Sequence, residues 1–292
     1  MMFKSIKIIG CFIASLVLSS SISFAQEIDE NGYNYNSLRP IRNADKMFMR
    51  TVWWRLDLRE KQNEGYYASG SEITKLVIDA VKAGVLRPFK NDSLTTRMSL
   101  QEFLDNLKMP GADEGMEEDI FGGDDAWGGG DAWGGGGDNW GGGGEEEVVD
   151  AGPNEFFPKQ IYYLELKEDL IFDKKRSRMY HDIQSIKLII PGDLYPTGID
   201  KELATFSYKE LVENLFVDNP QAVWYNTQNI AENKNFAEAF ELRQFTGRII
   251  KYSNPKGNYI EDIYSGNLKL GLAKSQEYRH KLVEYEAVLW SY

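Results

Sequence analysis

The chain has 292 residues, of which 42% are hydrophobic and 13% aromatic, so it can bury a sizeable core in one large domain or in two of ordinary size. Its formal charge of −12 is concentrated, because residues 111–150 hold 13 acidic and no basic residues, while residues 1–25 hold two lysines and no acids. Of the 33 basic and 45 acidic residues, 31 and 32 lie outside these stretches, a balance that argues against nucleic-acid binding or steering to an anionic membrane.

Residues 1–25 have the pattern of a secretory signal peptide. Two lysines precede an apolar run at residues 8–18, and the small residues Ser23 and Ala25 form a cleavage site before Gln26. We expect cleavage after Ala25 and export of the mature chain.

The only cysteine, Cys11, lies inside this first segment. A lipoprotein signal is the weaker alternative, because only ten residues precede the cysteine and the apolar run continues beyond it. After cleavage, neither a disulfide nor a thiolate site is possible. No later stretch reaches the roughly 18 apolar residues of a membrane span, so the mature chain should be soluble.

Residues 26–45 are predicted to form an extended N-terminal arm, and residues 46–110 a first α+β segment. A strand is predicted at residues 51–63, because apolar and polar residues alternate there with the period of a half-buried strand. Its apolar face should build core, and its charged face should form an interface. The apolar face carries Val52, Trp54, Leu56 and Leu58, and the charged face carries Trp53, Arg55, Asp57 and Arg59.

Two helices are predicted after this strand. Apolar residues at helical spacing, followed by Gly84 at the position of a left-handed cap, place the first helix at residues 72–83. Ser99 and Glu102 form a capping box ahead of an apolar run, which begins the second helix. The pair Pro110-Gly111 should end it.

Residues 111–152 are a low-complexity insert, with 15 glycines between positions 111 and 150. A short repeat, typified by Asp-Ala-Trp-Gly, recurs around Trp127, Trp133 and Trp140. Because glycine loses much entropy on ordering and the acids repel one another, we predict a disordered, extended loop. A tolerated surface insertion is the simpler interpretation; an interaction tail carried by the tryptophans, or a weak calcium sink, is the alternative.

Residues 153–217 form a second strand-led segment, with strands predicted at 161–168 and 186–190. At an offset of 108 residues, 161–215 matches 53–107 at 13 of 55 positions, clustered at a strand, a turn and a capping box that begins at Ser207. The middle of the match disagrees, because a helix in the first copy faces a strand in the second. Both a decayed duplication and a coincidence of common β-turn-α patterns stay open.

Residues 218–292 are predicted to be a mainly helical C-terminal extension. Asn219-Pro220 should begin a helix, and residues 236–243 continue helically. A strand at 246–252 and a turn at 254–258 precede a final helix at 273–290. The stripe of that helix is Tyr278, Leu282, Tyr285 and Leu289.

The sequence offers little catalytic chemistry and no cofactor or metal site. His181 and His280 each lie among charged residues and are expected to be solvated. No phosphate-loop, nucleophile-elbow or zinc-ligand pattern occurs. The residue types that remain prominent, Trp, Tyr and Arg, are those enriched at interfaces, although an ordinary aromatic core would explain the aromatics as well.

Two pairs of acids give the best case for an enzyme. Asp57 with Glu165, or Glu60 with Glu168, could act as the two carboxylates of an exported glycan hydrolase. The pattern predicts that these acids lie on the charged faces of strands, where cross-strand ion pairing explains them without a substrate. A soluble glycan- or peptide-binding module, with Trp53 or Tyr162 in a groove, is a further alternative.

Two blocks of sequence resemble the GldN/PorN family of gliding-motility and type IX secretion proteins. The first runs from Tyr35 through Arg39-Pro40-Ile41 to the Val-Trp-Trp-Arg-Leu-Asp-Leu-Arg-Glu-Lys-Gln-Asn stretch ending at Asn63. The second runs from Ala239 to Ile250 and continues into Ser253-Asn254-Pro255. The resemblance covers residues 33–292 apart from the insert, on which no family feature can be placed.

The resemblance implies a non-catalytic periplasmic subunit, peripheral to the outer membrane. Such proteins assemble into a ring with an outer-membrane lipoprotein of the GldK/PorK type and contact the GldL/GldM motor (GldM/PorM-like on its periplasmic side), so membrane association would come only through partners. The fold expected is α+β, with two possibly duplicated strand-led segments, the disordered insert and the helical extension. The candidate interface residues, chosen by type and mostly by position in the matching blocks, are Trp53, Trp54, Arg55, Arg59, Tyr162, Tyr163 and Arg243.

Overall fold

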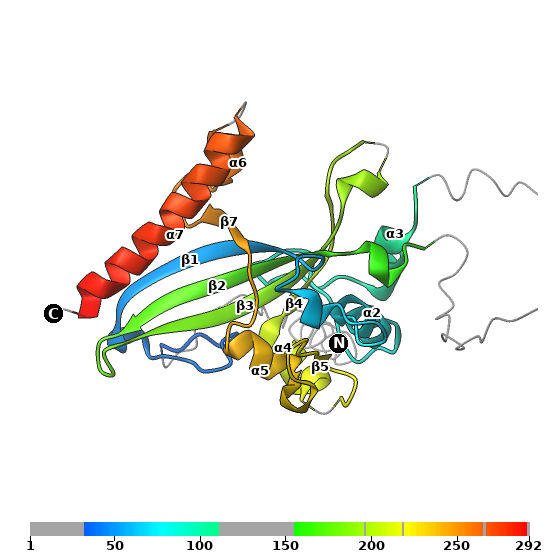
Figure 1. Cartoon of the computed structure of the whole chain (residues 1–292), viewed down its shortest axis with the longest axis horizontal. Helices are drawn as coiled ribbons and strands as arrows, with labels where there is room; N and C mark the ends of the chain where they lie inside the picture. The colour runs from blue at the N-terminus through cyan, green and yellow to red at the C-terminus, as the bar shows by residue number, and fades with distance from the viewer. Residues whose placement is uncertain (1–31, 111–154, 196, 218, 265–266, 291–292) are drawn as a thin grey trace, which may run out of the picture.

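The computed structural model describes residues 32–110, 155–195, 197–217, 219–264 and 267–290 (Figure 1). The predicted signal peptide and the whole of the predicted insert lie outside these ranges. Helices and antiparallel strands are mixed, which confirms the α+β class. The strands are β1 (Lys46–Asp57), β2 (Tyr163–Asp173), β3 (Arg178–Ile190), β4 (Lys201–Ser207), β5 (Val223–Trp224), β6 (Lys234–Asn235) and β7 (Arg248–Tyr252). The α-helices are α2 (Ile73–Lys82), α3 (Leu100–Leu107), α4 (Tyr208–Leu211), α5 (Phe236–Glu241), α6 (Ile260–Ile263) and α7 (Leu268–Trp290).

One five-stranded sheet, in the order β4-β3-β2-β1-β7, organises the described chain. β1 lies between β2 and β7 and pairs antiparallel with both. It starts five residues before the predicted strand, because the residues preceding Thr51 pair with the end of β2. It stops at Asp57, since the chain then enters the turns that precede Asn63.

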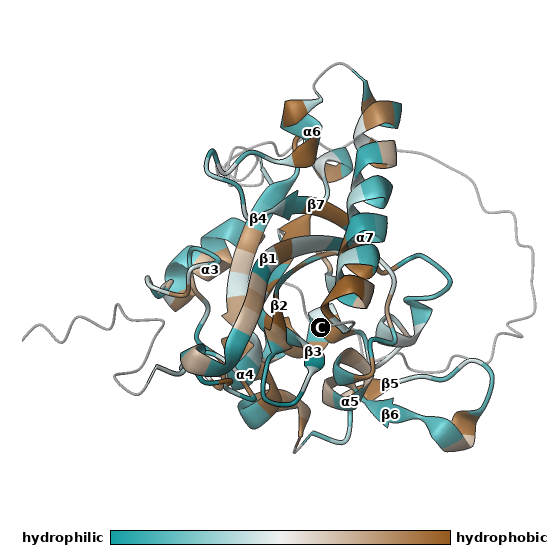
Figure 2. Ribbon diagram, turned by 90° about the vertical axis from the view of Figure 1, so that its left-hand side faces the viewer, coloured by the Kyte–Doolittle hydropathy of each residue, from teal (hydrophilic) through white to brown (hydrophobic). Residues whose placement is uncertain are grey.

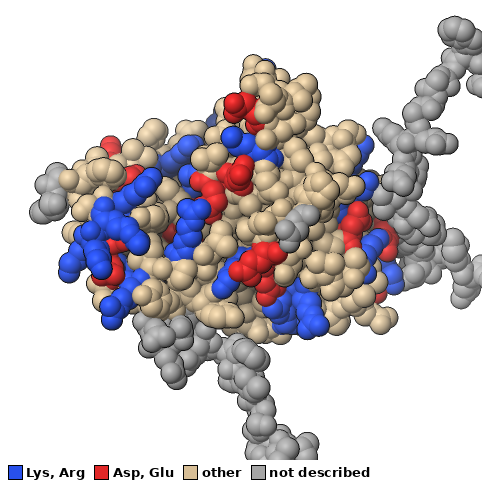
Figure 3. Space-filling view, turned by 90° about the horizontal axis from the view of Figure 1, so that it is seen from below, with Lys and Arg blue, Asp and Glu red and all other residues tan. Residues whose placement is uncertain are grey.

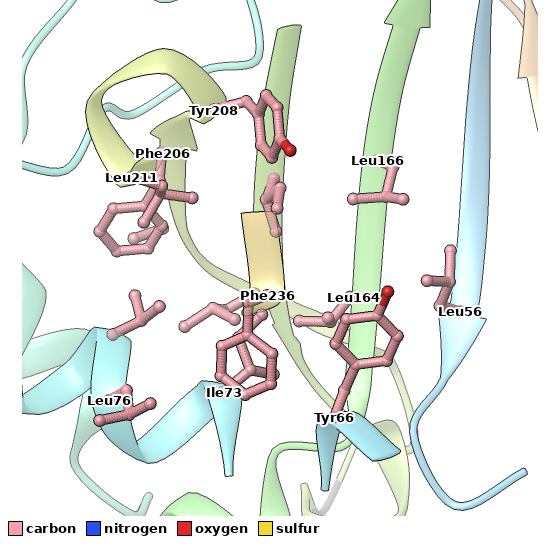
Figure 4. Close-up of a cluster of buried hydrophobic side chains, with 14 of the residues drawn as sticks. Leu56, Tyr66, Ile73, Leu76, Leu164, Leu166, Phe206, Tyr208, Leu211 and Phe236 are labelled. Carbon is pink, nitrogen blue, oxygen red and sulfur yellow. The ribbon is translucent and has the colours of Figure 1, made fainter. Parts of the chain in front are cut away.

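The core lies between one face of the sheet and the helices α2, α4 and α5 (Figure 4). Leu56 and Leu164 are cross-strand partners, and both are fully buried. α2 forms as predicted, because seven of its ten residues are buried and Gly84 adopts the expected left-handed conformation with φ 75°. The rings of Tyr66 and Phe240 pack 4.7 Å apart at the centre of this layer.

The two predicted capping boxes behave differently. The Ser99 hydroxyl accepts a hydrogen bond from the backbone N–H of Glu102 at 3.2 Å, so α3 is capped as predicted. Ser207 makes no such bond, and the four-residue α4 continues into a π-helical turn at Val212–Phe216. Between the matched blocks, the first segment contains α2 where the second contains β3.

The C-terminal segment contains the helices α5, α6 and α7 and also the strands β5, β6 and β7. Asn219 and Pro220 lie in a turn before β5 instead of beginning a helix, because the buried Ala222 and the β5-β6 hairpin follow at once. β7, which matches the strand predicted at residues 246–252, joins the main sheet beside β1. The segment therefore adds a strand to the main sheet as well as its helices.

α7 starts five residues before the predicted helix and packs along β1 and β7 (Figure 2). Its predicted stripe is the packed side: Tyr278 stacks on Tyr252 with ring centroids 4.3 Å apart, and Tyr285 lies 4.8 Å from Phe48. The Ser275 hydroxyl donates to the Ile249 carbonyl at 2.7 Å.

The described part of the N-terminal arm is held against β3. The Asn34 amide donates to Gln184 at 2.9 Å, and the buried Ser37 hydrogen-bonds with Asp182. Burial raises the pKa of Asp182 to about 6, with the nearby Asp169 carboxylate adding to the effect, although bonds from Ser37 and Gln184 oppose it.

Truncation of the central cross-strand pair tests this core. Leu164→Ala should lower the free energy of unfolding by about 2–5 kcal/mol, because a fully buried leucine leaves a cavity in a packed layer. Leu100→Ala, at a position 47% exposed, is the matched control and should change it by less than about 0.5 kcal/mol. Urea unfolding followed by circular dichroism measures both, and equal losses would contradict the proposed core.

The arm contact predicts an unusual pH dependence. With a folded pKa of about 6, Asp182 is easier to protonate in the native chain than in the unfolded one, so its contribution to stability falls as pH rises from about 4 to 6. Asp182→Asn should therefore stabilise the protein by about 1–3 kcal/mol at pH 7.5 and by little at pH 4. Urea midpoints across this range measure it, and a gain that is the same at both pH values would contradict the assignment.

Candidate functional site

The face of the sheet opposite the core carries charged and aromatic side chains from four strands. β1 contributes Trp53 and Arg55, β2 contributes Glu165, β3 contributes Lys187 and β7 contributes Lys251. They share this face because residues two apart on a strand point the same way and because the register pairs them across the strands. We call this surface the charged face. The apolar residues of the core, such as Leu56 and Leu164, alternate with them and point to the other side.

Trp53 lies between two ammonium groups. Lys251 Nζ is 4.8 Å and Lys167 Nζ is 5.9 Å from its ring, and its indole Nε1 donates to the Asp92 carboxylate at 2.8 Å. Lys167 also donates to the Asp92 backbone carbonyl at 3.1 Å. The loop that carries Asp92 is thereby fixed over the sheet, and the indole is held in one orientation by cation–π and hydrogen-bond contacts.

The centre of the charged face consists of ion pairs. Arg55 Nη1 lies 2.8 Å from Asp200 Oδ2. Lys187 Nζ lies 2.8 Å from Glu202 Oε1 and 3.7 Å from Glu165 Oε1. Burial raises the pKa of Glu165 in spite of Lys187 and Arg55. Burial also disfavours the charged form of Lys187, but the carboxylates of Glu165 and Glu202 prevail and raise its pKa.

Arginines and tyrosines form a continuous strip at the end of β1. Arg59 Cζ lies 3.5 Å from the Tyr162 ring, Arg55 Cζ lies 5.7 Å from the Tyr163 ring, and the two tyrosine rings meet edge to face at 4.7 Å. Burial raises the pKa of Tyr162 to about 12, against the effect of Arg59. With Trp53, these residues are five of the seven predicted interface residues, and the structure brings them together.

The other two predicted residues, Trp54 and Arg243, lie on the core side of the sheet. Trp54 is 6% exposed, and its Nε1 donates to Glu168 Oε2 at 2.7 Å. Arg243 forms an ion pair with Glu168 Oε1, and its guanidinium lies 5.5 Å from the Trp54 ring. Their position indicates a structural role: Trp54 builds core, as its place on the apolar face predicted.

Glu168 joins Trp54 and Arg243 through its carboxylate, and the prediction that it lies on a charged face is wrong. It is 1% exposed, because it shares the side of β2 that carries Leu164 and Leu166. His181, expected to be solvated, has its Nδ1 only 3.2 Å from Glu168 Oε1. Burial alone would raise the pKa of Glu168, but the bonds from His181 and Arg243 outweigh it and lower the pKa. The period-two spacing from the two leucines was the signal that could have located it.

Three of the four acids considered for hydrolysis are engaged in structural contacts. Asp57 accepts two hydrogen bonds from the Arg59 guanidinium, at 3.2 and 3.0 Å, and Glu165 lies beside Lys187. Glu168 is buried, and Glu60 is exposed in the turn after β1. Within the described ranges, no group of three or more His, Cys, Asp or Glu residues could hold a metal ion.

A small cavity of about 120 Å³ lies between α6, α7 and β7. Neither Trp53 nor Tyr162, the residues proposed for a ligand-binding groove, lines it. Its lining residues are Tyr252, Ile260, Ile263, Tyr264, Lys274, Glu277, Tyr278 and Lys281.

Replacing the buried carboxylate tests its structural role. Glu168→Gln should lower the free energy of unfolding by about 3–5 kcal/mol at pH 7, because Arg243 would lose its buried partner. Since the folded pKa of Glu168 is lowered, its stabilising effect is present above the unfolded pKa of about 4.3 and is lost as pH falls further. The difference from the parent chain should therefore shrink toward pH 3.

Glu202→Gln is the matched control, because Glu202 is 54% exposed on the charged face. Its effect should stay below about 1 kcal/mol at every pH. Urea unfolding from pH 3 to 8 compares the two, and a Glu168→Gln variant as stable as Glu202→Gln would show that the buried network contributes nothing.

Comparison with known proteins gives a family match over nearly the whole chain. Residues 41–291 match the family described as "Gliding motility associated protein GldN". A search of curated proteins finds no match. No helix in the described ranges has the length and apolar character needed to cross a membrane. Members of the GldN family are structural components of gliding motility and type IX secretion, and the family is not a known enzyme family. This chain belongs to the GldN family.

Proposed function

We propose that this chain is a non-catalytic periplasmic subunit of the type IX secretion and gliding-motility machinery. It forms a ring with an outer-membrane lipoprotein of the GldK/PorK type and couples that ring to the periplasmic GldM/PorM-like part of the motor. The observation that carries the proposal is the family match over residues 41–291. The signal-peptide pattern of residues 1–25 supports export to the periplasm.

The charged face supports a role in protein contacts. Its carboxylates are paired with cations, as at Arg55 and Lys187, so they serve structure rather than proton transfer. Tryptophan, tyrosine and arginine are the residue types that carry most binding energy at interfaces. Trp53 and Arg59 present these types at the surface of a rigid sheet, with Arg59 50% exposed. We therefore assign partner binding to the strip that runs from Trp53 to Tyr162.

Co-expression with the envelope lipoprotein tests the assembly. We expect the two proteins to co-purify and to form ring-shaped particles by electron microscopy. A chain that stays monomeric and cross-links to no envelope lipoprotein would count against the proposal.

Substitution on the charged face tests the assigned surface. Trp53→Ala should weaken lipoprotein binding by about tenfold to thirtyfold, the effect of losing an aromatic hot spot. Trp290→Ala removes a tryptophan that is 60% exposed on α7 and should leave binding unchanged. Binding is measured by interferometry on the purified lipoprotein, with thermal unfolding as a check on folding. Equal binding by both variants would place the interface elsewhere.

A further inference from the structure

The turn between β2 and β3 presents a concentration of positive charge that the proposed function does not use. Lys174 to Ser177 form this turn, and all four residues are exposed. The neighbouring cations Arg42 and Lys46 lie on the chain that enters β1, and the Lys174 backbone N–H donates to the Asp45 carbonyl at 2.8 Å. We define the basic tip as Arg42, Lys46, Lys174, Lys175, Arg176 and Arg178.

The basic tip has few anions of its own. Asp173 is its nearest carboxylate, but this group is 2% exposed and accepts bonds from the backbone N–H groups of Lys175 and Arg176 and from the Arg176 guanidinium. In the described part of the chain, Lys174 and Lys175 form no ion pair. The six cations outnumber the nearby carboxylates Asp45, Asp173 and Asp182, of which Asp182 interacts with Lys46. Lys and Arg side chains gather at this end of the molecule (Figure 3).

The matching anion is present in the same sequence. Residues 111–150 carry 13 acidic residues and no basic one, while the chain outside this stretch and the first 25 residues is almost neutral. This acidic segment, residues 111–150, is the largest excess of one charge in the protein. Opposite charge at this density attracts over about 10 Å at 0.1 M salt.

The acidic segment joins the described chain at the opposite end of the fold from the basic tip. The segment joins the described chain beyond α3, where Lys108 and Glu155 form a β-bridge, and Figure 1 shows this point at the far end of the sheet from the β2–β3 turn. β3 alone, with 13 residues, spans about 43 Å of the intervening distance. The residues that flank the acidic segment, positions 110 and 155, therefore lie at the other end of the sheet from the tip of their own chain.

The structure assigns the basic tip as the docking site for the acidic segment of a second copy of the chain. Two complementary patches at opposite ends make a head-to-tail contact, which closes into a ring or continues as a filament according to the rotation between copies. The inference rests on the proposed function only for the presence of neighbouring copies. Its test needs no lipoprotein, so the two can fail separately.

Complementation between two full-length variants tests the contact. The first variant, Lys174→Glu with Lys175→Glu, keeps the acidic segment but lowers the formal charge of the six tip residues from +6 to +2. The second keeps the tip and replaces every Asp and Glu of residues 111–150 by Asn and Gln. We expect the parent mature chain to associate with rising concentration at about 0.02 M salt and to dissociate at about 0.5 M, where charges are screened. Each variant alone should remain monomeric, and their mixture should form dimers and nothing larger.

The matched control reverses two exposed lysines elsewhere, in Lys256→Glu with Lys269→Glu. It changes the net charge as much as the tip variant does, and it should associate like the parent chain. Sedimentation velocity measures the four proteins and the mixture of the two variants, and thermal unfolding checks that each variant is folded. Loss of association in the control would show a general charge effect and overturn the assignment.

Two other outcomes would also overturn it. A mixture of the two variants that stays monomeric would show that the segments of different copies do not bind the tip. Binding of phosphatidylglycerol vesicles by the tip, lost in the Lys174→Glu, Lys175→Glu variant while the parent chain stays monomeric, would identify a lipid surface as the partner. Rings formed with the lipoprotein by the tip variant would leave the proposed function intact while removing this contact from it.

Discussion

The carboxylate of Glu168 is the point at which separate parts of the chain become one structure. It lies on β2 inside the apolar face and contacts Trp54 of β1, His181 of β3 and Arg243 after α5. An unpaired charge in this place would be costly, because burial disfavours the ionised form. The sheet therefore requires the C-terminal segment to return and supply the guanidinium, which explains why β7 and α5 belong to the same body as β1.

The same strand pairing produces the opposite surface. Since side chains alternate along β1, fixing Trp54 and Leu56 in the core sends Trp53 and Arg55 to the other side. There the side chains are restrained by one another, as when Lys251 and Asp92 hold the Trp53 indole. A surface of this kind is preorganised. Its arginine and tryptophan side chains are already restrained, so they lose less conformational entropy when a partner binds than mobile side chains would.

Local patterns predicted the elements, but not the contacts between distant parts of the chain. The alternation around Val52, the Gly84 cap and the Ser99 cap are decided within a few residues, and each appears as predicted. By contrast, Asn219-Pro220 begins no helix and Ser207 caps none, because tertiary packing overrides a weak local preference. Five of the seven candidate interface residues lie together, yet Arg243 could be assigned to the core only once its buried partner was known.

The covering of the sheet edges limits how copies of this protein can meet. At one edge, Phe89 forms two backbone hydrogen bonds with Thr205 of β4, at 2.7 and 3.0 Å. At the other, Ser275 of α7 donates to the Ile249 carbonyl of β7. Strands of two chains pair through exposed sheet edges. In this protein, contacts within the chain occupy part of both edges. Pairing of strands between copies is therefore hindered at these positions, which directs attention to side-chain contacts of the charged face and the basic tip, both of which include residues of β1 and β3.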